Sequence, residues 1–219
     1  MKRNDSEKRD SSTRNTSGKI KADKQAFLVY GVILIISISI MYVLLQTPAN
    51  PLRMLTRFAA TFGYLAIFLA ILSSECMSRM KKLSGFPFLK AHHHLARIGI
   101  LLILAHPVLL ILDGQSFRIF LPVLHSAGQF LATGGRPALY LFLLATSIAI
   151  YRRKYKNWKK IHYLHYPAFL LVSAHALLIG TDFTSNIMRL LAFAMSLAVI
   201  GIFVNKRAAK KRKAIKSRK

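Results

Sequence analysis

Six long apolar segments limit what this chain of 219 residues can fold into. Each is roughly 17 to 25 residues long, the length that a helix needs to cross about 30 Å of hydrocarbon. Hydrophobic residues make up 53% of the chain, which excludes an ordinary soluble domain. We therefore expect an all-α integral membrane protein, a six-helix transmembrane bundle with spans near residues 26–46, 57–75, 92–112, 136–151, 161–180 and 186–204. Five helices are the alternative, because the ends of the second and fourth runs are uncertain.

The sequence divides into a membrane domain and two basic tails. Residues 1–25 are charged and rich in Ser and Asn, with no apolar periodicity, so we expect a disordered basic cytoplasmic tail. The apolar run that follows is too long for a secretory signal and lacks a small-residue cleavage pattern, so we expect it to be retained as a helix. The membrane domain then covers residues 26–204, and residues 205–219 form a second basic cytoplasmic tail.

Lysine and arginine indicate the orientation in the membrane. Of the 33 basic residues, 27 fall in the two tails and in the connections near residues 78–90 and 151–160. Because cytoplasmic loops retain Lys and Arg, six helices with both termini cytoplasmic place every basic cluster on one side of a plasma or inner membrane. The net charge of +26 also suggests nucleic acid. Basic segments directly beside spans instead favour contact with anionic lipid at the inner face, so no nucleic-acid partner is expected.

Histidines inside the predicted spans are the main functional signal. Seven of the eight histidines lie on the third and fifth spans, where ionisable residues are rare and usually functional. His92 and His162 fall near the inner surface, whereas His106 and His175 fall deeper, toward the outer surface. His92 and His106 are 14 residues apart on the third span, which is about 21 Å of helix. His162 and His175 are 13 residues apart on the fifth span, which is about 20 Å. The sequence therefore predicts two levels of histidines on two parallel helices.

Helical phase supports this arrangement on one of the two helices. On a regular helix His106 lies about 40° around the axis from His92, whereas His175 lies about 140° from His162. Pro167 lies between the latter two, and a kink there would change the phase. Pro107 loosens the third span in the same way. The fifth span therefore needs a local distortion to place both of its histidines on one side.

Paired neutral imidazoles favour a haem iron over a bare metal ion. A zinc or copper site needs three or four ligands at one point, whereas each level here supplies two axial nitrogens. The single cysteine, Cys76, excludes a cysteine-based cluster, and with seven Asp and Glu in the chain no catalytic residues are predicted. The alternatives are histidines that hydrogen-bond across helix interfaces, or a non-redox transporter or assembly factor that uses them as a relay.

The segments "HHHLARIGILLILAHP" and "WKKIHYLHYPAFLLVSAHALLIGTD" resemble the transmembrane domain of the ferric reductase and NADPH oxidase superfamily. The resemblance covers roughly residues 26–204 and implies six helices with two b-type haems. Carried over by position, it implies His92 with His162 for the inner haem and His106 with His175 for the outer haem. It also implies electron transport from a cytoplasmic or membrane donor to an external acceptor, as an oxidoreductase component.

Two features of the histidine-rich segments leave alternatives open. His93 has a spacing of 13 residues to the deeper histidine, which the superfamily also shows, so it is the alternate to His92, and His94 is the least favoured. His165 is expected to support or flank its neighbour His162, although it could substitute for it. Arg97 is expected either to pair with a haem propionate or to extend its long stem to the inner interface.

The sequence contains no GxGxxG run between a strand and a helix, so FAD and NADPH are expected only on a separate partner. The donor would be a flavoprotein, a ferredoxin-like protein or a quinol, and no residue identifies the external acceptor. Stand-alone members of the superfamily include the haem-binding membrane subunit of the periplasmic methionine sulfoxide reductase system. A single-haem subunit of that kind is therefore the alternative, and the extra histidine on the third span favours two haems.

Overall fold

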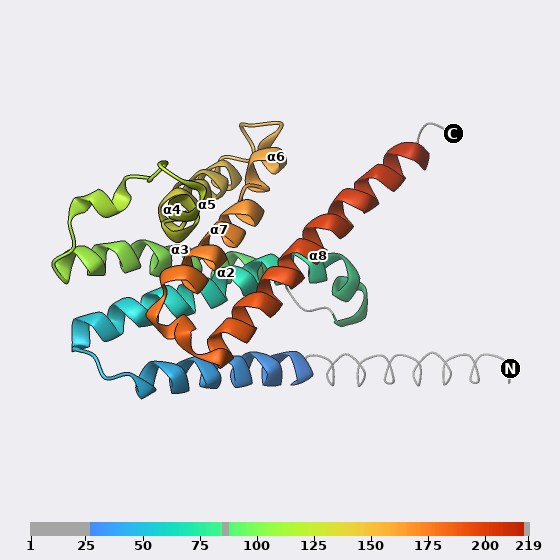
Figure 1. The fold of residues 1–219 in the computed structure, drawn as a ribbon. Coiled ribbons are helices and arrows are strands. Elements are labelled where there is room, and N and C mark those ends of the chain that lie inside the picture. Colours follow the sequence, from blue (N-terminus) through green and yellow to red (C-terminus); the bar gives the residue numbers. More distant parts are fainter. Residues whose placement is uncertain (1–26, 85–87, 217–219) are drawn as a thin grey trace, which may run out of the picture.

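The structure, a computed structural model, describes residues 27–84 and 88–216, and within these ranges it contains helices and no strand. The predicted tail of residues 1–25 lies outside the described residues. An N-terminal helix, Phe27–Gln46, precedes the other elements, of which Figure 1 labels α2 to α8. These are α2 (Pro51–Ser84), α3 (Phe88–Leu112), η1 (Phe117–Phe120), α4 (Ala127–Ala132), α5 (Gly135–Ile150), α6 (Trp158–His162), α7 (His165–Ile179), η2 (Thr181–Thr184) and α8 (Asn186–Lys216).

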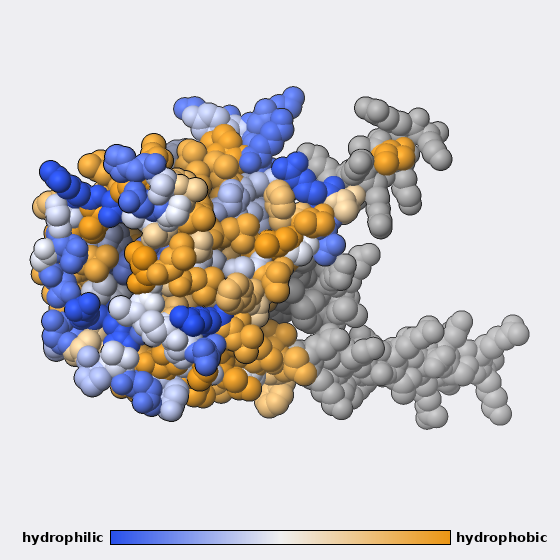
Figure 2. All heavy atoms as spheres, viewed as in Figure 1, coloured by the Kyte–Doolittle hydropathy of each residue, from blue (hydrophilic) through white to orange (hydrophobic). Residues whose placement is uncertain are grey.

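The chain is an all-helical membrane protein. In the part that the structure describes, four helices contain stretches long and apolar enough to cross a membrane, and these stretches are Phe27–Gln46, Pro51–Ser74, Leu89–Leu112 and Asn186–Ala209. The predicted span at 136–151 corresponds to the shorter apolar helix α5. Figure 2 shows apolar side chains over the middle of one face, with hydrophilic residues gathered along its left edge and toward its upper right. This distribution suits a surface surrounded by lipid.

The predicted span at 161–180 is interrupted rather than continuous. α6 ends at His162, and α7 begins at His165 after a turn at Tyr163 and Leu164. Pro167 explains the position of this break, because proline lacks an N–H and its ring clashes with the carbonyl group four residues earlier, which belongs to Tyr163. Pro167 itself lies in the first turn of α7, where proline is tolerated. The interruption therefore changes the phase between His162 and the rest of the span.

Two glycines bring α2 and α3 into close contact. A Cβ atom at Gly63 would lie 3.1 Å from Leu102 Cβ, and one at Gly99 would lie 2.8 Å from Ile67 Cδ1. Small residues of this kind let membrane helices approach closely. α3 remains continuous through Pro107, so the expected loosening does not interrupt this helix. The histidine-bearing helix α3 is thus fixed against α2.

The described ends of the chain lie on the same side of the molecule. Figure 1 shows the start of the N-terminal helix and the end of α8 both toward the right of the view. α8 remains helical to Lys216, beyond the predicted span end at 204, and α2 continues to Ser84, beyond the predicted end at 75. Both extensions contain several basic residues. Hydropathy indicates where the apolar part of a helix ends, so the prediction stopped before the basic ends of these two helices.

Candidate functional site

His92 and His162 lie together although they come from different helices. His92 is in the second turn of α3, His162 is the last residue of α6, and their ring centroids are 6.5 Å apart with the rings nearly perpendicular. The Nδ1 atom of His92 is 2.8 Å from the carbonyl oxygen of Ala70 on α2. The Nδ1 atom of His162 is 3.0 Å from the carbonyl oxygen of Ala145 on α5. We call His92 and His162 the inner pair.

His106 and His175 occupy the second predicted level. The Nδ1 atom of His106 on α3 is 3.2 Å from the carbonyl oxygen of Thr56 on α2. The Nδ1 atom of His175 on α7 is 2.7 Å from the carbonyl oxygen of Ala132 on α4. The two rings are close enough to influence each other electrostatically. We call them the outer pair.

One hydrogen-bond pattern is shared by all four histidines. A carbonyl oxygen only accepts hydrogen bonds, so in each case Nδ1 carries the proton and donates it. A neutral ring with a proton on Nδ1 keeps its lone pair on Nε2, the nitrogen that is then free to bind a metal. Ligating histidines almost always donate their second nitrogen to a carbonyl, carboxylate or water in this way, which fixes the ring orientation. The backbone of α2, α4 and α5 thus orients four imidazoles and leaves Nε2 of each ring unprotonated.

Gly135 leaves open the space beside the outer pair. A Cβ atom at this position would lie 3.0 Å from both Nε2 and Cδ2 of His175. Any side chain at Gly135 would therefore press on the nitrogen that the hydrogen bond to Ala132 leaves unprotonated. The absence of a side chain here keeps that edge of the ring accessible.

The inner pair has a separation that suits a haem iron. Imidazole nitrogen binds a first-row metal at about 2 Å, so two rings on opposite sides of one iron have centroids about 6 Å apart. The observed separation is 6.5 Å. α3 packs mainly along α2 and makes few contacts with α5 and α7. Groups of three or more His, Cys, Asp or Glu side chains able to hold a bare metal ion do not occur within the described residues.

The other histidines of the two segments differ from the four. The part of the chain that the structure describes gives His93 and His94 no hydrogen bond, although the ring of His93 lies 5.8 Å from that of His92. His165 donates from Nδ1 to the carbonyl oxygen of His162, within its own turn, and its ring lies 4.7 Å from the His162 ring. Among the histidines that the structure describes, only the four paired ones donate to carbonyl groups at least 17 residues away in the sequence.

Arg97 is exposed on α3, one turn beyond the histidine triplet. No ion pair or hydrogen bond to another described residue holds its guanidinium group. Its pairing with a propionate therefore stays a prediction, as does its alternative position at the interface.

A buried ion pair between Arg57 and Asp182 was not predicted from the sequence. Arg57 lies on α2 and is 8% exposed, and Asp182 lies on η2 and is 7% exposed. Arg57 Nε donates to Asp182 Oδ1 at 2.9 Å, Nη2 contacts the same carboxylate, and Nη1 donates to the carbonyl oxygen of Thr47 at 2.7 Å. The available signal was a lone arginine and a lone aspartate at the ends of two apolar runs. Arg57 directly follows Thr56, which holds His106, so the ion pair lies near the outer pair.

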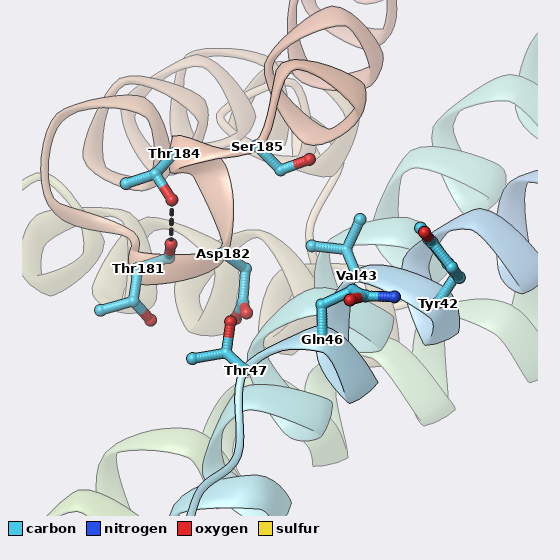
Figure 3. A pocket seen from close by; sticks show the side chains of 8 residues that line it. All are labelled: Tyr42, Val43, Gln46, Thr47, Thr181, Asp182, Thr184 and Ser185. Carbon is cyan, nitrogen blue, oxygen red and sulfur yellow. Dashed lines mark hydrogen bonds between the residues drawn. The ribbon is translucent and has the colours of Figure 1, made fainter.

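A small polar pocket lies at the same end of the molecule. It has a volume of about 210 Å³ and is formed where the N-terminal helix ends against η2 and the start of α8. Figure 3 shows its lining residues, which are Tyr42, Val43, Gln46, Thr47, Thr181, Asp182, Thr184 and Ser185. The carboxylate in its lining, Asp182, already pairs with Arg57. None of these lining residues is a histidine.

A family model described as "Ferric reductase like transmembrane component" matches residues 55–173, which is more than half of the chain. The matched segment contains His92, His106 and His162 and ends two residues before His175. No curated protein matches the chain. No solved structure matches it either.

Proposed function

Because the chain belongs to the ferric reductase-like transmembrane family, we propose that it transfers electrons across a membrane through two b-type haems, each held between two histidines. The observation that carries this proposal is the shared hydrogen-bond pattern of His92, His106, His162 and His175, which leaves Nε2 of each ring free to bind iron. Family members generally bind haem, and the separation of the inner pair supports that chemistry here.

The two levels define what the protein contributes to the reaction. Bound haem supplies one-electron exchange between ferric and ferrous iron. His92 and His162 would hold one haem, and His106 and His175 would hold the other. The carbonyl groups of Ala70, Thr56, Ala145 and Ala132 hold the rings in place. The levels are about 20 Å apart along the helices, so they span much of the apolar thickness.

We place both termini on the cytoplasmic side of a plasma or inner membrane, with residues 26–204 as a six-helix membrane domain between two basic tails. The positive-inside pattern supports this orientation, because the basic connection at 151–160 and the end of α8 would then share a side. Anionic lipid at the inner face would contact the basic residues. Members of the family usually work with a separate redox partner, and here we propose a flavoprotein, a ferredoxin-like protein or a quinol as donor. The acceptor lies on the external side.

The first prediction concerns how a protein donor docks. Six basic residues of the connection at 151–160 and of α6 are exposed near the inner pair: Arg152, Arg153, Lys154, Lys156, Lys159 and Lys160. A complementary acidic donor would be attracted to them, and raising ionic strength from about 0.01 to 0.15 M shortens the screening length from about 30 to 8 Å. The rate of haem reduction by the donor should therefore fall on the order of tenfold, as measured by stopped-flow absorbance. A rate independent of salt would contradict electrostatic docking and favour a quinol.

The second prediction tests the proposed function itself. Protein purified in detergent should be red, contain two b-type haems per chain and show a b-type reduced-minus-oxidised spectrum. Haem quantified against protein concentration measures the stoichiometry. One haem per chain would instead favour a membrane subunit that feeds an external reductase, as in the methionine sulfoxide reductase system. A colourless preparation would return the histidines to helix packing or to a transporter.

A further inference from the structure

Lys206 lies inside the bundle near the inner pair. It belongs to α8, close to the end of the apolar stretch Asn186–Ala209, and is only partly exposed. Its Nζ atom donates to Ser74 Oγ on α2 at 3.0 Å. Ser74 is one helical turn from Ala70, whose carbonyl group holds His92. The residue that accepts from the ammonium group therefore lies about 6 Å along α2 from Ala70, which holds His92.

A second set of contacts connects Lys206 to the other half of the inner pair. Its Nζ atom lies 5.8 Å from the ring centroid of Tyr166, which is 2% exposed. The Tyr166 ring lies 4.3 Å from that of His165, and the His165 ring lies 4.7 Å from that of His162. The positive charge is close enough to act electrostatically on both His162 and His165. Contacts thus connect Lys206 to the helix that supports His92 and, through Tyr166 and His165, to His162.

The neighbouring cation on α8 behaves differently. Arg207 is exposed, and its guanidinium carbon lies 5.1 Å from the ring centroid of Phe203, on the same helix. A long basic side chain at the end of a span usually extends to the interface, and Arg207 stays exposed and contacts its own helix. Lys206 instead turns inward to another helix, although an ammonium group away from water is costly. A role in topology alone does not account for that direction.

We propose that Lys206 is a positioning residue that raises the reduction potential of the iron held by His92 and His162. The inference rests on the proposed function, since it requires haem at the inner pair. Ferrous haem carries one positive charge less than ferric haem, so a fixed cation nearby favours the reduced form. Electrons would then enter more readily at the end of the protein where the donor docks.

Equilibrium redox titration of the purified protein, followed in the haem absorption bands, tests this role. Lys206→Gln removes the charge and keeps a donor for Ser74. At a fixed ambient potential it should lower the ferrous-to-ferric ratio of one haem component about tenfold, which is 59 mV for a one-electron couple, and leave the other component unchanged. Lys206→Arg keeps the charge and should stay near the wild-type potential. Arg207→Gln, the matched control, removes an adjacent charge that faces outward and should shift neither component.

Each outcome separates this inference from the proposed function. Wild-type protein without haem would defeat the proposed function, and the inference would fall with it. Wild-type protein with two haems whose potentials are unchanged in Lys206→Gln would overturn the inference alone. If Lys206→Gln and Lys206→Met both lose the inner haem, retention of haem and potential in Lys206→Arg would support a role of the charge. Loss in Lys206→Arg as well would overturn it.

Discussion

Replacing His162 with alanine is expected to lower the haem content from two to one per chain. Under the proposed function, the substitution removes one of the two imidazoles that would hold the inner haem, together with the hydrogen bond to Ala145 that orients the ring. His106→Ala should remove the other haem for the same reason, because its ring is held by Thr56. Haem quantification per chain measures both losses, and the haem that remains should keep its own reduction potential.

His165→Ala is the matched control for His162→Ala. His165 lies in the same segment with its ring 4.7 Å from His162, but it donates its hydrogen bond within its own turn. Both haems should be retained. Loss of one haem in His165→Ala with retention of both in His162→Ala would move the ligand to His165.

Alanine substitutions also test which of His92, His93 and His94 would hold the inner haem. His92→Ala should lose the inner haem, whereas His93→Ala and His94→Ala should retain both, because only His92 donates to the carbonyl oxygen of Ala70. A loss in His93→Ala alone would assign the ligand to the alternate position.

The positions of most helices and the distortion near Pro167 follow from the sequence, but the helix ends do not. Runs of apolar residues predict a membrane helix because hydrocarbon requires them, and each of the six runs coincides with helical structure. The same criterion cannot find where a helix ends in water, so the basic extensions of α2 and α8 were missed. The break before α7 is expected from Pro167, and its site one turn earlier follows from the clash of the proline ring with the carbonyl group of Tyr163.

Residue type predicts which histidines could bind a metal, but not what holds them. The levels of His92, His106, His162 and His175 follow from helix rise alone. Their hydrogen-bond acceptors are backbone carbonyl groups, which every residue has, so no letter in the sequence identifies them. The contact between Lys206 and Ser74, which are 132 residues apart, is likewise a product of tertiary packing.

Breaking the ion pair of Arg57 with Asp182 on one side should strongly destabilise the region near the outer pair. Both side chains are buried, and the guanidinium group also donates to Thr47. Removing one partner leaves the other charge buried without compensation, which typically costs about 3 to 5 kcal/mol. Asp182→Asn and Arg57→Met should therefore each lower the thermal midpoint in detergent on the order of 10 °C.

Two further variants separate the effect of the unpaired charge from general damage. The double variant Arg57→Met with Asp182→Leu removes both charges, so it should be more stable than either single variant. Arg53→Met changes an exposed arginine one turn earlier on α2 and should alter the free energy of unfolding by less than about 0.5 kcal/mol. A double variant no more stable than the single ones would contradict a penalty from the unpaired charge. Because Arg57 adjoins Thr56, which holds His106, heating the single variants should release the outer haem before the inner one.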